Sequence, residues 1–492
     1  MRITVGRRFT SKLAAPAALA MLLSCGTVAW AQSSASSESV SDLKSEVQEL
    51  QREVHALKGE VTTIKTQTAI VPAPPADQKA MTIGEHVGSI GKDLSGLKSD
   101  LSTNLGVHIH GLVDTTYEYN FNQPKTYPPG GSGRTNQLRV FDTNANSFDL
   151  EQFNLHVDRT ADGGVGFVTD LNFGEVANAL SAATHYSNAF GLGSSAIDVT
   201  QAYLTYTVPF AKGINLSLGK FVTLLGEEVI PTWNGNNFNI SRSFAFGYTI
   251  PFTHTGLRAQ YSFNDYVGAT LGVNNGWDDV SDNNDGKTIE GQLALNSGSL
   301  MSENQSLAFT LSGIWGAEQA GQGNSHRWVV NPILTYHTPI KGLQLIGEFV
   351  YGEDDGTDYV SPYVTSQGNS ITTHPVNPWT GAYLVENPSW ASTAGYIVYD
   401  WTDNLELALR GEWFRDSDGA RTGLRQTLGE VTGTINYKIP YVTGLLARLE
   451  YRHDESSAKP FYTNAGINPL TGIPYQTIAG QDTLMAAAVY SF

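Results

Sequence analysis

Two different periodicities divide the chain. From Val40 to Ile64 apolar residues recur at alternating intervals of three and four, whereas from Gly106 to Phe492 they recur mainly at intervals of two. The first spacing places apolar side chains along one stripe of an α-helix, and the second places them on one face of a β-strand. The pattern therefore predicts a short helical segment followed by an all-β domain.

The predicted strands have one apolar face and one charged face. In residues 445–454 (LLARLEYRHD) and residues 405–414 (LELALRGEWF), Leu, Ala and aromatic residues alternate with Arg, Glu and Asp. The apolar face of a soluble β-sandwich packs on a second sheet, whereas that of a transmembrane β-barrel contacts lipid while the polar face lines the lumen. Strands of about ten residues with both signs of charge on one face favour the barrel.

The connections between the predicted strands alternate between short and long. Asn264–Asp265 and Asp403–Asn404 are short, whereas Leu224–Phe252, Ala317–His326 and Gly352–Trp390 are longer. Bacterial outer-membrane barrels have an even number of strands, short periplasmic turns and long outer loops. We therefore expect residues 106–492 to form a transmembrane β-barrel of about 16 antiparallel strands.

The sequence ends in an apolar strand, AAAVYSF, whose last residue is Phe492. Chain ends are usually solvated and mobile, so an aromatic residue at this position indicates a terminus held within the structure. We expect the last strand to pair with the first, because this closes the barrel and leaves no free edge.

Residues 32–68 are predicted to form a short α-helical coiled coil, and residues 69–105 a Pro-rich linker (IVPAPPADQ) with a weak helix. Val at the a positions, mainly Leu at the d positions, and Glu and Lys at flanking positions fit a parallel oligomer. A single amphipathic helix lying on its own protein has the same pattern, so that alternative stays open. The core positions are Val40, Leu43, Val47, Leu50, Val54, Leu57, Val61 and Ile64.

The first 31 residues have the features of an export signal. Basic residues precede the apolar run LAAPAALAMLL, and AWA before Gln32 fits a cleavage site. Cys25, in LLSCG, would instead fit lipoprotein processing, and the sequence leaves open whether Cys25 is lipidated. No later apolar run is long enough for a transmembrane helix.

Composition argues against several other functions. Asp and Glu outnumber Lys and Arg by 47 to 30, and this acidic balance disfavours nucleic-acid binding. We expect no enzyme and no cofactor, since no nucleophile with an orienting base stands out. His108 and His110 lack a third metal ligand, and Asp278–Gly286 (DDVSDNNDG) does not fit the EF-hand pattern, so we expect no metal site.

Five stretches of the predicted barrel together point to a known family. They are Gly111–Pro124 (GLVDTTYEYNFNQP), Ser147–Arg159 (SFDLEQFNLHVDR), Val199–Ile230 (VTQAYLTYTVPFAKGINLSLGKFVTLLGEEVI), Pro251–Asp265 (PFTHTGLRAQYSFND) and Leu271–Gly291 (LGVNNGWDDVSDNNDGKTIEG). These stretches resemble the β-barrel porin-2 (OmpL-like) family of outer-membrane proteins. The resemblance implies an outer-membrane channel and brings no catalytic residues. Tyr490 and Phe492 at the terminus also resemble the signal by which the barrel-assembly machinery recognises such proteins.

A barrel of this size encloses an aqueous channel, so we hypothesise an outer-membrane porin for passive diffusion of small hydrophilic solutes or ions. The acidic total charge of the chain favours cations over anions. Either Leu224–Phe252 or Gly352–Trp390 could form the constriction, or both could be solvated outer loops. The candidate pore-lining residues, which could equally form salt bridges that only brace the wall, are Glu348, Arg410, Glu412, Arg448, Glu450 and Arg452.

The expected partners are outer-membrane lipid, lipopolysaccharide, the barrel-assembly machinery, small polar solutes and further copies of the chain, with a trimer favoured. The coiled coil would then lie in the periplasm. A hypothesis of a different class is a structural anchor, in which the barrel holds the chain in the membrane and the coiled coil tethers or oligomerises it.

Overall fold

The computed structural model describes residues 102–103, 105–125, 134–159, 164–183, 196–298, 301, 305–355, 357–360, 383–465 and 476–492. The predicted signal peptide (1–31), the predicted coiled coil (32–68) and nearly all of the predicted linker (69–105) lie outside the described residues.

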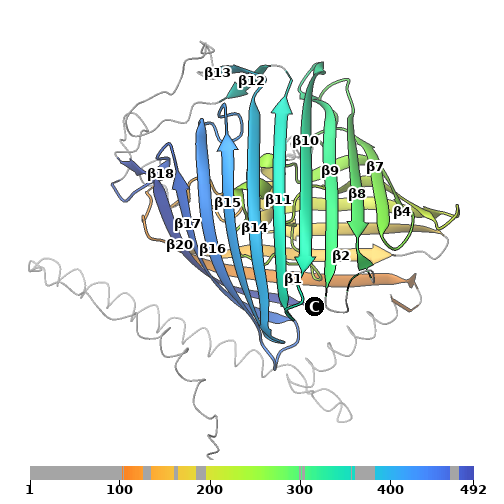
Figure 1. Cartoon of the computed structure of the whole chain (residues 1–492), viewed down its shortest axis with the longest axis horizontal. Helices are drawn as coiled ribbons and strands as arrows, with labels where there is room; N and C mark the ends of the chain where they lie inside the picture. Colours follow the sequence, from red (N-terminus) through yellow and green to blue (C-terminus); the bar gives the residue numbers. More distant parts are fainter. Residues whose placement is uncertain are drawn as a thin grey trace, which may run out of the picture. The chain divides into compact units, whose positions relative to one another are not determined.

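The described residues form one closed antiparallel barrel of 16 strands, which confirms this part of the predicted fold (Figure 1). Each strand pairs with the next in the chain, apart from two small hairpins in the connections. The barrel strands are β1 Val107–Asn120, β2 Ser147–Arg159, β3 Val165–Phe173, β4 Ile197–Val208, β5 Ile214–Val222, β6 Thr253–Ser262, β7 Val267–Asn274, β8 Thr288–Asn296, β9 Ser306–Gln319, β10 Gln322–His337, β11 Leu343–Asp354, β14 Ser389–Thr402, β15 Leu405–Asp416, β16 Gln426–Lys438, β17 Leu445–Ser456 and β20 Gly480–Ser491.

The connections carry the remaining elements. Within the part of the chain that the structure describes, no helix is both long and apolar enough to cross a membrane. The elements are the hairpin of β12 (Thr357–Val360) and β13 (Tyr383–Glu386), the hairpin of β18 (Phe461–Tyr462) and β19 (Thr477–Ile478), the α-helix α4 (Glu175–Ala183) and the π-helix η2 (Ala245–Thr249).

Burial along the strands is the reverse of that in a soluble protein. In β17 the side chains of Leu449 and Tyr451 are exposed, whereas Glu450 and Arg452 are almost completely buried. In soluble proteins charged residues are rarely buried, and apolar residues fill the core. An apolar outer face around a polar interior is the arrangement of a barrel surrounded by hydrocarbon.

The last strand closes the barrel as predicted. Strand β20 pairs with both β17 and β1, and the pairing continues to the terminal residue. The backbone of Phe492 exchanges two hydrogen bonds of 3.0 Å with the backbone of Gly111. A Cβ atom at Gly111 would lie 2.3 Å from Cζ of Phe492, so glycine leaves room for the terminal aromatic ring.

One predicted loop was wrong. The sequence pattern places residues 317–326 in a loop, but β9 and β10 continue through Gln319 and from Gln322 and join in a tight hairpin. Gly321 has φ +70°, which such a tight turn requires. The apolar alternation fades here because backbone pairing continues beyond the apolar band.

We expect Gly111→Leu to impair barrel closure, because the new side chain would displace the ring of Phe492 at the β1–β20 seam. The measurement is the fraction of purified protein that shows the faster gel migration of a folded barrel before heating. Gly433→Leu is the matched control, since a Cβ at Gly433 in β16 has no atom within 4 Å. Equal folded fractions for the two variants would contradict the role of Gly111.

Candidate functional site

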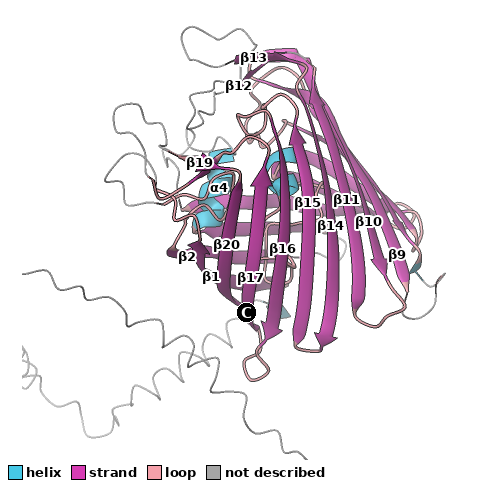
Figure 2. Ribbon diagram, turned by 60° about the vertical axis from the view of Figure 1, so that its left-hand side comes forward, coloured by secondary structure: helices cyan, strands magenta, loops and turns pink. Residues whose placement is uncertain are grey.

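The connection between β5 and β6, residues 223–252, folds into the barrel, and we call it the inward loop. Gly226 has φ +94°, and a Cβ there would lie 2.6 Å from Cδ1 of Ile250. Backbone hydrogen bonds between Thr232 and Gly235 close a turn at the middle of the loop. Near its end the loop forms η2. Figure 2 shows helical segments, α4 among them, beside the inner face of the barrel wall.

Two carboxylates of the wall hold the second half of the inward loop. Glu450 accepts hydrogen bonds from the backbone N–H groups of Ile240 (2.5 Å) and Ser241 (2.9 Å). Glu412 accepts them in the same way from Phe244 (2.6 Å) and Ala245 (2.5 Å). A hydrogen bond to a charged group contributes about 1.5–3 kcal/mol, so each carboxylate is a strong attachment point.

Three arginines of the wall bind carbonyl groups of the same loop. Arg410 donates to the carbonyl of Ser241 (2.8 Å) and also pairs with Glu228 in the loop and Glu430 in β16. The other contacts are Arg448 to the carbonyl of Asn237 (2.7 Å) and Arg452 to the carbonyl of Arg242 (2.5 Å). Arg410 and Arg452 are therefore paired with carboxylates, Arg448 is hydrogen-bonded to Asn436, and all three are capped by loop backbone.

The structure brings all six predicted pore-lining residues to the inner face of the barrel and into contact with the inward loop. Glu348 completes the set, since it accepts hydrogen bonds from Asn331 (3.0 Å) and from the backbone N–H of Glu227 (3.3 Å). None of the six is more than 7% exposed. Their contacts are those of a bracing network, and the loop that they hold covers them.

The inward loop also touches strands away from this charged wall. The ring of Trp233 stacks on His110 of β1, with centroids 3.8 Å apart. Gln152 of β2 donates to the carbonyl of Pro231 (2.8 Å), and Ser312 of β9 donates to the carbonyl of Leu224 (2.9 Å). The loop therefore reaches from β8–β11 and β15–β17 to β1 and β2 and crosses the barrel interior.

An apolar cluster inside the barrel supports the loop. Phe141, from the β1–β2 connection, packs against Phe246 and Phe252, with ring centroids 5.6 and 5.3 Å apart. Val176 and Leu180 of α4 belong to the same buried cluster. Sequence reasoning missed it because aromatic residues in a long connection carry no strand period. The local signals were the apolar spacing in EVANALSAA and the aromatic group FAFGYTIPF.

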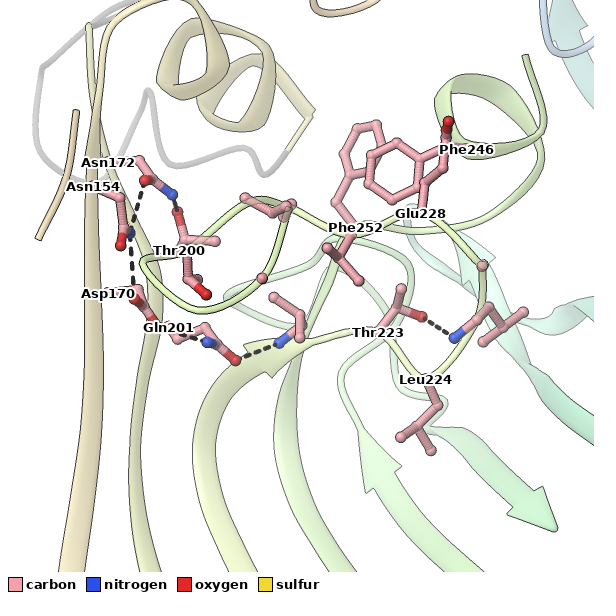
Figure 3. A pocket seen from close by; sticks show the side chains of 17 residues that line it. Asn154, Asp170, Asn172, Thr200, Gln201, Thr223, Leu224, Glu228, Phe246 and Phe252 are labelled. Carbon is pink, nitrogen blue, oxygen red and sulfur yellow. Dashed lines mark hydrogen bonds between the residues drawn. The ribbon is translucent and has the colours of Figure 1, made fainter. Parts of the chain in front are cut away.

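A cavity of about 300 Å³ lies between the inward loop and the inner face of β2–β4 (Figure 3). The strands contribute Asn154, Asp170, Asn172, Thr200 and Gln201, and the loop faces them with Phe246, Phe252 and the backbone around Gly226. A second cavity of about 460 Å³ is lined by Phe252, Trp277, Arg327 and Arg421, among others. Phe252 contributes to both cavities.

Two carboxyl groups in the connections between strands have a raised pKa. Burial, with a smaller effect from the neighbouring charge of Glu228, raises the pKa of Glu227 to about 7. Burial likewise raises the pKa of Asp278 to about 6, although this carboxylate accepts hydrogen bonds from the backbone N–H groups of Phe252 and Thr253 (both 2.8 Å). The charge of the inward loop therefore changes near neutral pH, where Glu227 takes up a proton.

The two predicted histidines of β1 have separate contacts. His108 pairs with Asp158 (3.3 Å), whereas His110 stacks on Trp233. Among the described residues, no group of three or more His, Cys, Asp or Glu side chains is arranged to hold a metal ion. Asp278 caps the start of β6, and Asp279 accepts a hydrogen bond from Asn283 (2.8 Å), so these acidic residues stabilise their own connection.

A family model described as putative beta-barrel porin-2, OmpL-like, matches residues 106–492, which is the whole barrel. The chain belongs to this family. It is therefore a porin of the outer membrane that provides a channel for small solutes. No curated protein sequence matches the chain.

Several solved structures have a similar fold. OprB of Pseudomonas putida, at high pH, has 10% sequence identity and a TM-score of 0.50, covering 81% of this chain and 97% of that chain. The outer membrane channel DcaP of Acinetobacter baumannii has 11% identity and a TM-score of 0.45 (78% and 97%). The trimer form of OmpT, an outer membrane protein of Vibrio cholerae, has 11% identity and a TM-score of 0.42 (78% and 99%). At these identities the likeness concerns the fold.

We expect Glu450→Ala to release part of the inward loop, because it removes the acceptor of two backbone N–H groups. The loss of two charge-assisted hydrogen bonds costs about 3–6 kcal/mol. The sheet should still close into a barrel, but the single-channel current should become larger and noisier. Glu455→Ala is the matched control, since Glu455 lies on the same strand with a 59% exposed side chain. Identical current traces for wild type and Glu450→Ala would contradict the anchoring role.

Proposed function

We propose that solutes pass between the inward loop and β2–β4, and that this passage favours cations. The observation that carries the proposal is the cavity between these two surfaces. The loop is hydrogen-bonded to the wall at β8–β11, at β15–β17 and, through Gln152, at one point of β2; the cavity separates the rest of the loop from β2–β4. The larger cavity shares Phe252 with this one, and we propose that it continues the route.

The charges on this route support cation preference. Asp170 and Glu228 are among the residues that line the smaller cavity, and its described lining includes no Lys or Arg; since Glu228 pairs with Arg410, the preference depends on Asp170. Arg410, Arg448 and Arg452 are at most 5% exposed and hold the loop, so their charges face protein groups. We assign the six charged wall residues a positioning role: they set the place of the loop and thereby the width of the passage.

We expect Asp170→Asn to reduce the preference for K⁺ over Cl⁻. A unit charge about 7 Å from a hydrated ion contributes about 0.6 kcal/mol, favourable for K⁺ and unfavourable for Cl⁻, so its removal should change the permeability ratio roughly sevenfold. The measurement is the reversal potential of purified protein in a planar bilayer under a KCl gradient. The control is Asp265→Asn, which removes the same charge from an exposed short turn.

A folded barrel that passes no ions would overturn the proposed channel. Anion selectivity in the wild type, or equal reversal potentials for Asp170→Asn and Asp265→Asn, would overturn only the assignment of the cation-preferring passage.

We further propose the arrangement that the rest of the sequence suggests. Residues 1–31 direct export, residues 32–68 form a periplasmic coiled coil, and residues 69–105 link it to the barrel. Tyr490 and Phe492 act as the signal for the barrel-assembly machinery, which is supported by the exposed position of both rings on the outer face of β20. Lipid and lipopolysaccharide contact the apolar outer face, and copies of the chain associate as a trimer. No catalytic role is proposed.

We expect Leu50→Glu combined with Leu57→Glu to weaken the oligomer and leave the conductance of each barrel unchanged, because the core of the coiled coil would be charged. The measurement is the temperature at which the oligomer dissociates in detergent. Gln48→Glu combined with His55→Glu is the matched control, since it adds the same charges outside the predicted core. Loss of envelope integrity with unchanged oligomer stability would instead support the structural anchor.

A further inference from the structure

We propose that the cavity between the inward loop and β2–β4 is a binding site for small organic cations that carry a primary ammonium group on an apolar body. The inference rests on the proposed function, because it places the site on the conducting route. Its volume of about 300 Å³ is at the lower end of the range for small-molecule sites in proteins. Two walls of different chemistry enclose it (Figure 3).

The strand wall has already used amide donors within itself. Asn172 donates to Thr200 (2.6 Å), and Gln201 donates to Asp170 (2.6 Å). Asn154 donates to the side-chain oxygens of Asn172 (2.9 Å) and Asp170 (3.3 Å). Figure 3 shows these side chains joined in one hydrogen-bonded row along the wall. Asn154 has thereby used both of its N–H groups, so a bound molecule can meet its side chain only as a donor.

One acceptor on this wall lacks a partner. Oδ1 of Asn154 makes no hydrogen bond with any described residue, although Asn154 is 0% exposed. The orientation of the amide is determined by its surroundings, because exchanging nitrogen and oxygen would place Oδ1 against the oxygens of Asn172 and Asp170. A buried acceptor without a donor costs about 1–3 kcal/mol, and an N–H group of a bound molecule would satisfy it.

The charge at the cavity favours a positive donor. Asp170 and Glu228 contribute carboxylates to the lining. Each has one cationic or ionisable neighbour, since His156 lies 2.9 Å from Asp170 and Arg410 pairs with Glu228. An ammonium group offers three N–H donors and no acceptor, so it matches the unpartnered acceptor of Asn154 and the carboxylate of Asp170, whereas Glu228 is already paired with Arg410.

The loop wall selects for an apolar body. The rings of Phe246 and Phe252 lie with centroids 5.5 Å apart, and Leu225 and Ile230 are buried beside them in the same apolar cluster. Apolar groups bound here would be removed from water, and an aromatic face also attracts a nearby cation. A neutral sugar fits less well, because it brings no positive charge to Asp170 and its many hydroxyl groups would lose water against the apolar loop wall.

The probe is benzylammonium, and the readout is concentration-dependent block of the K⁺ current through the full-length protein in planar bilayers. We expect saturable block in the wild type, with about tenfold weaker affinity in Asn154→Leu and about threefold weaker affinity in Phe252→Leu. Asn215→Leu, at an exposed position near a short turn, is the matched control and should keep the wild-type affinity. Benzyl alcohol and glucose test whether the charge is needed.

The outcomes distinguish failure of the proposed binding site from failure of the proposed channel. Selective K⁺ conduction without saturable block overturns the binding site and leaves the channel intact. Equal block of wild type and Asn154→Leu, or equal block by benzyl alcohol or glucose, also overturns it. If Asn154→Leu does not assemble, Phe252→Leu decides by the same criterion. If the folded protein does not conduct, titration calorimetry of benzylammonium with the detergent-solubilised wild type and Phe252→Leu tests binding directly.

Discussion

The need to satisfy every backbone hydrogen bond in hydrocarbon determines the form of this protein. A strand edge left open in lipid would expose unpaired N–H and C=O groups at a cost of several kcal/mol each. The chain meets this constraint by pairing β20 with β1 up to the last residue, where Phe492 and Gly111 exchange backbone hydrogen bonds. Once the sheet is closed, the alternation of side chains decides which residues meet lipid and which lie inside.

The charged side chains inside the barrel place a second constraint on the fold. A closed wall of this size leaves a lumen in which charged side chains need partners, since burying an unpaired charge is costly. The inward loop supplies these partners with its own backbone. Successive N–H groups meet Glu412 and Glu450, and its carbonyl groups meet Arg410 and Arg452. The same contacts that satisfy the wall charges therefore hold the loop across the channel.

The sequence predicted the charged wall, but not what the wall does. The alternation around Arg410 and Glu450 identified inward-facing charges, because a period of two is local and can be read from one strand at a time. The partners of these residues lie more than 150 positions away in the chain, within residues 223–252. No local pattern links the wall residues to the loop, so the sequence alone could not distinguish pore lining from bracing of the wall. The cavity beside Asn154 was likewise missed, because it is a space between segments and has no pattern of its own.

The sequence by itself determined the closed all-β barrel, its outward apolar face, and the seam at Phe492. These features follow from the alternation of apolar and polar residues, from the lengths of the connections and from the need to leave no strand edge unpaired. Each of these acts on neighbouring residues or on the chain as a whole. Only the tertiary structure decided which loop turns inward, which charges it covers and where a cavity remains. Those features depend on how the backbone of an irregular segment meets distant side chains, and a loop without a repeating period carries no signal for such contacts.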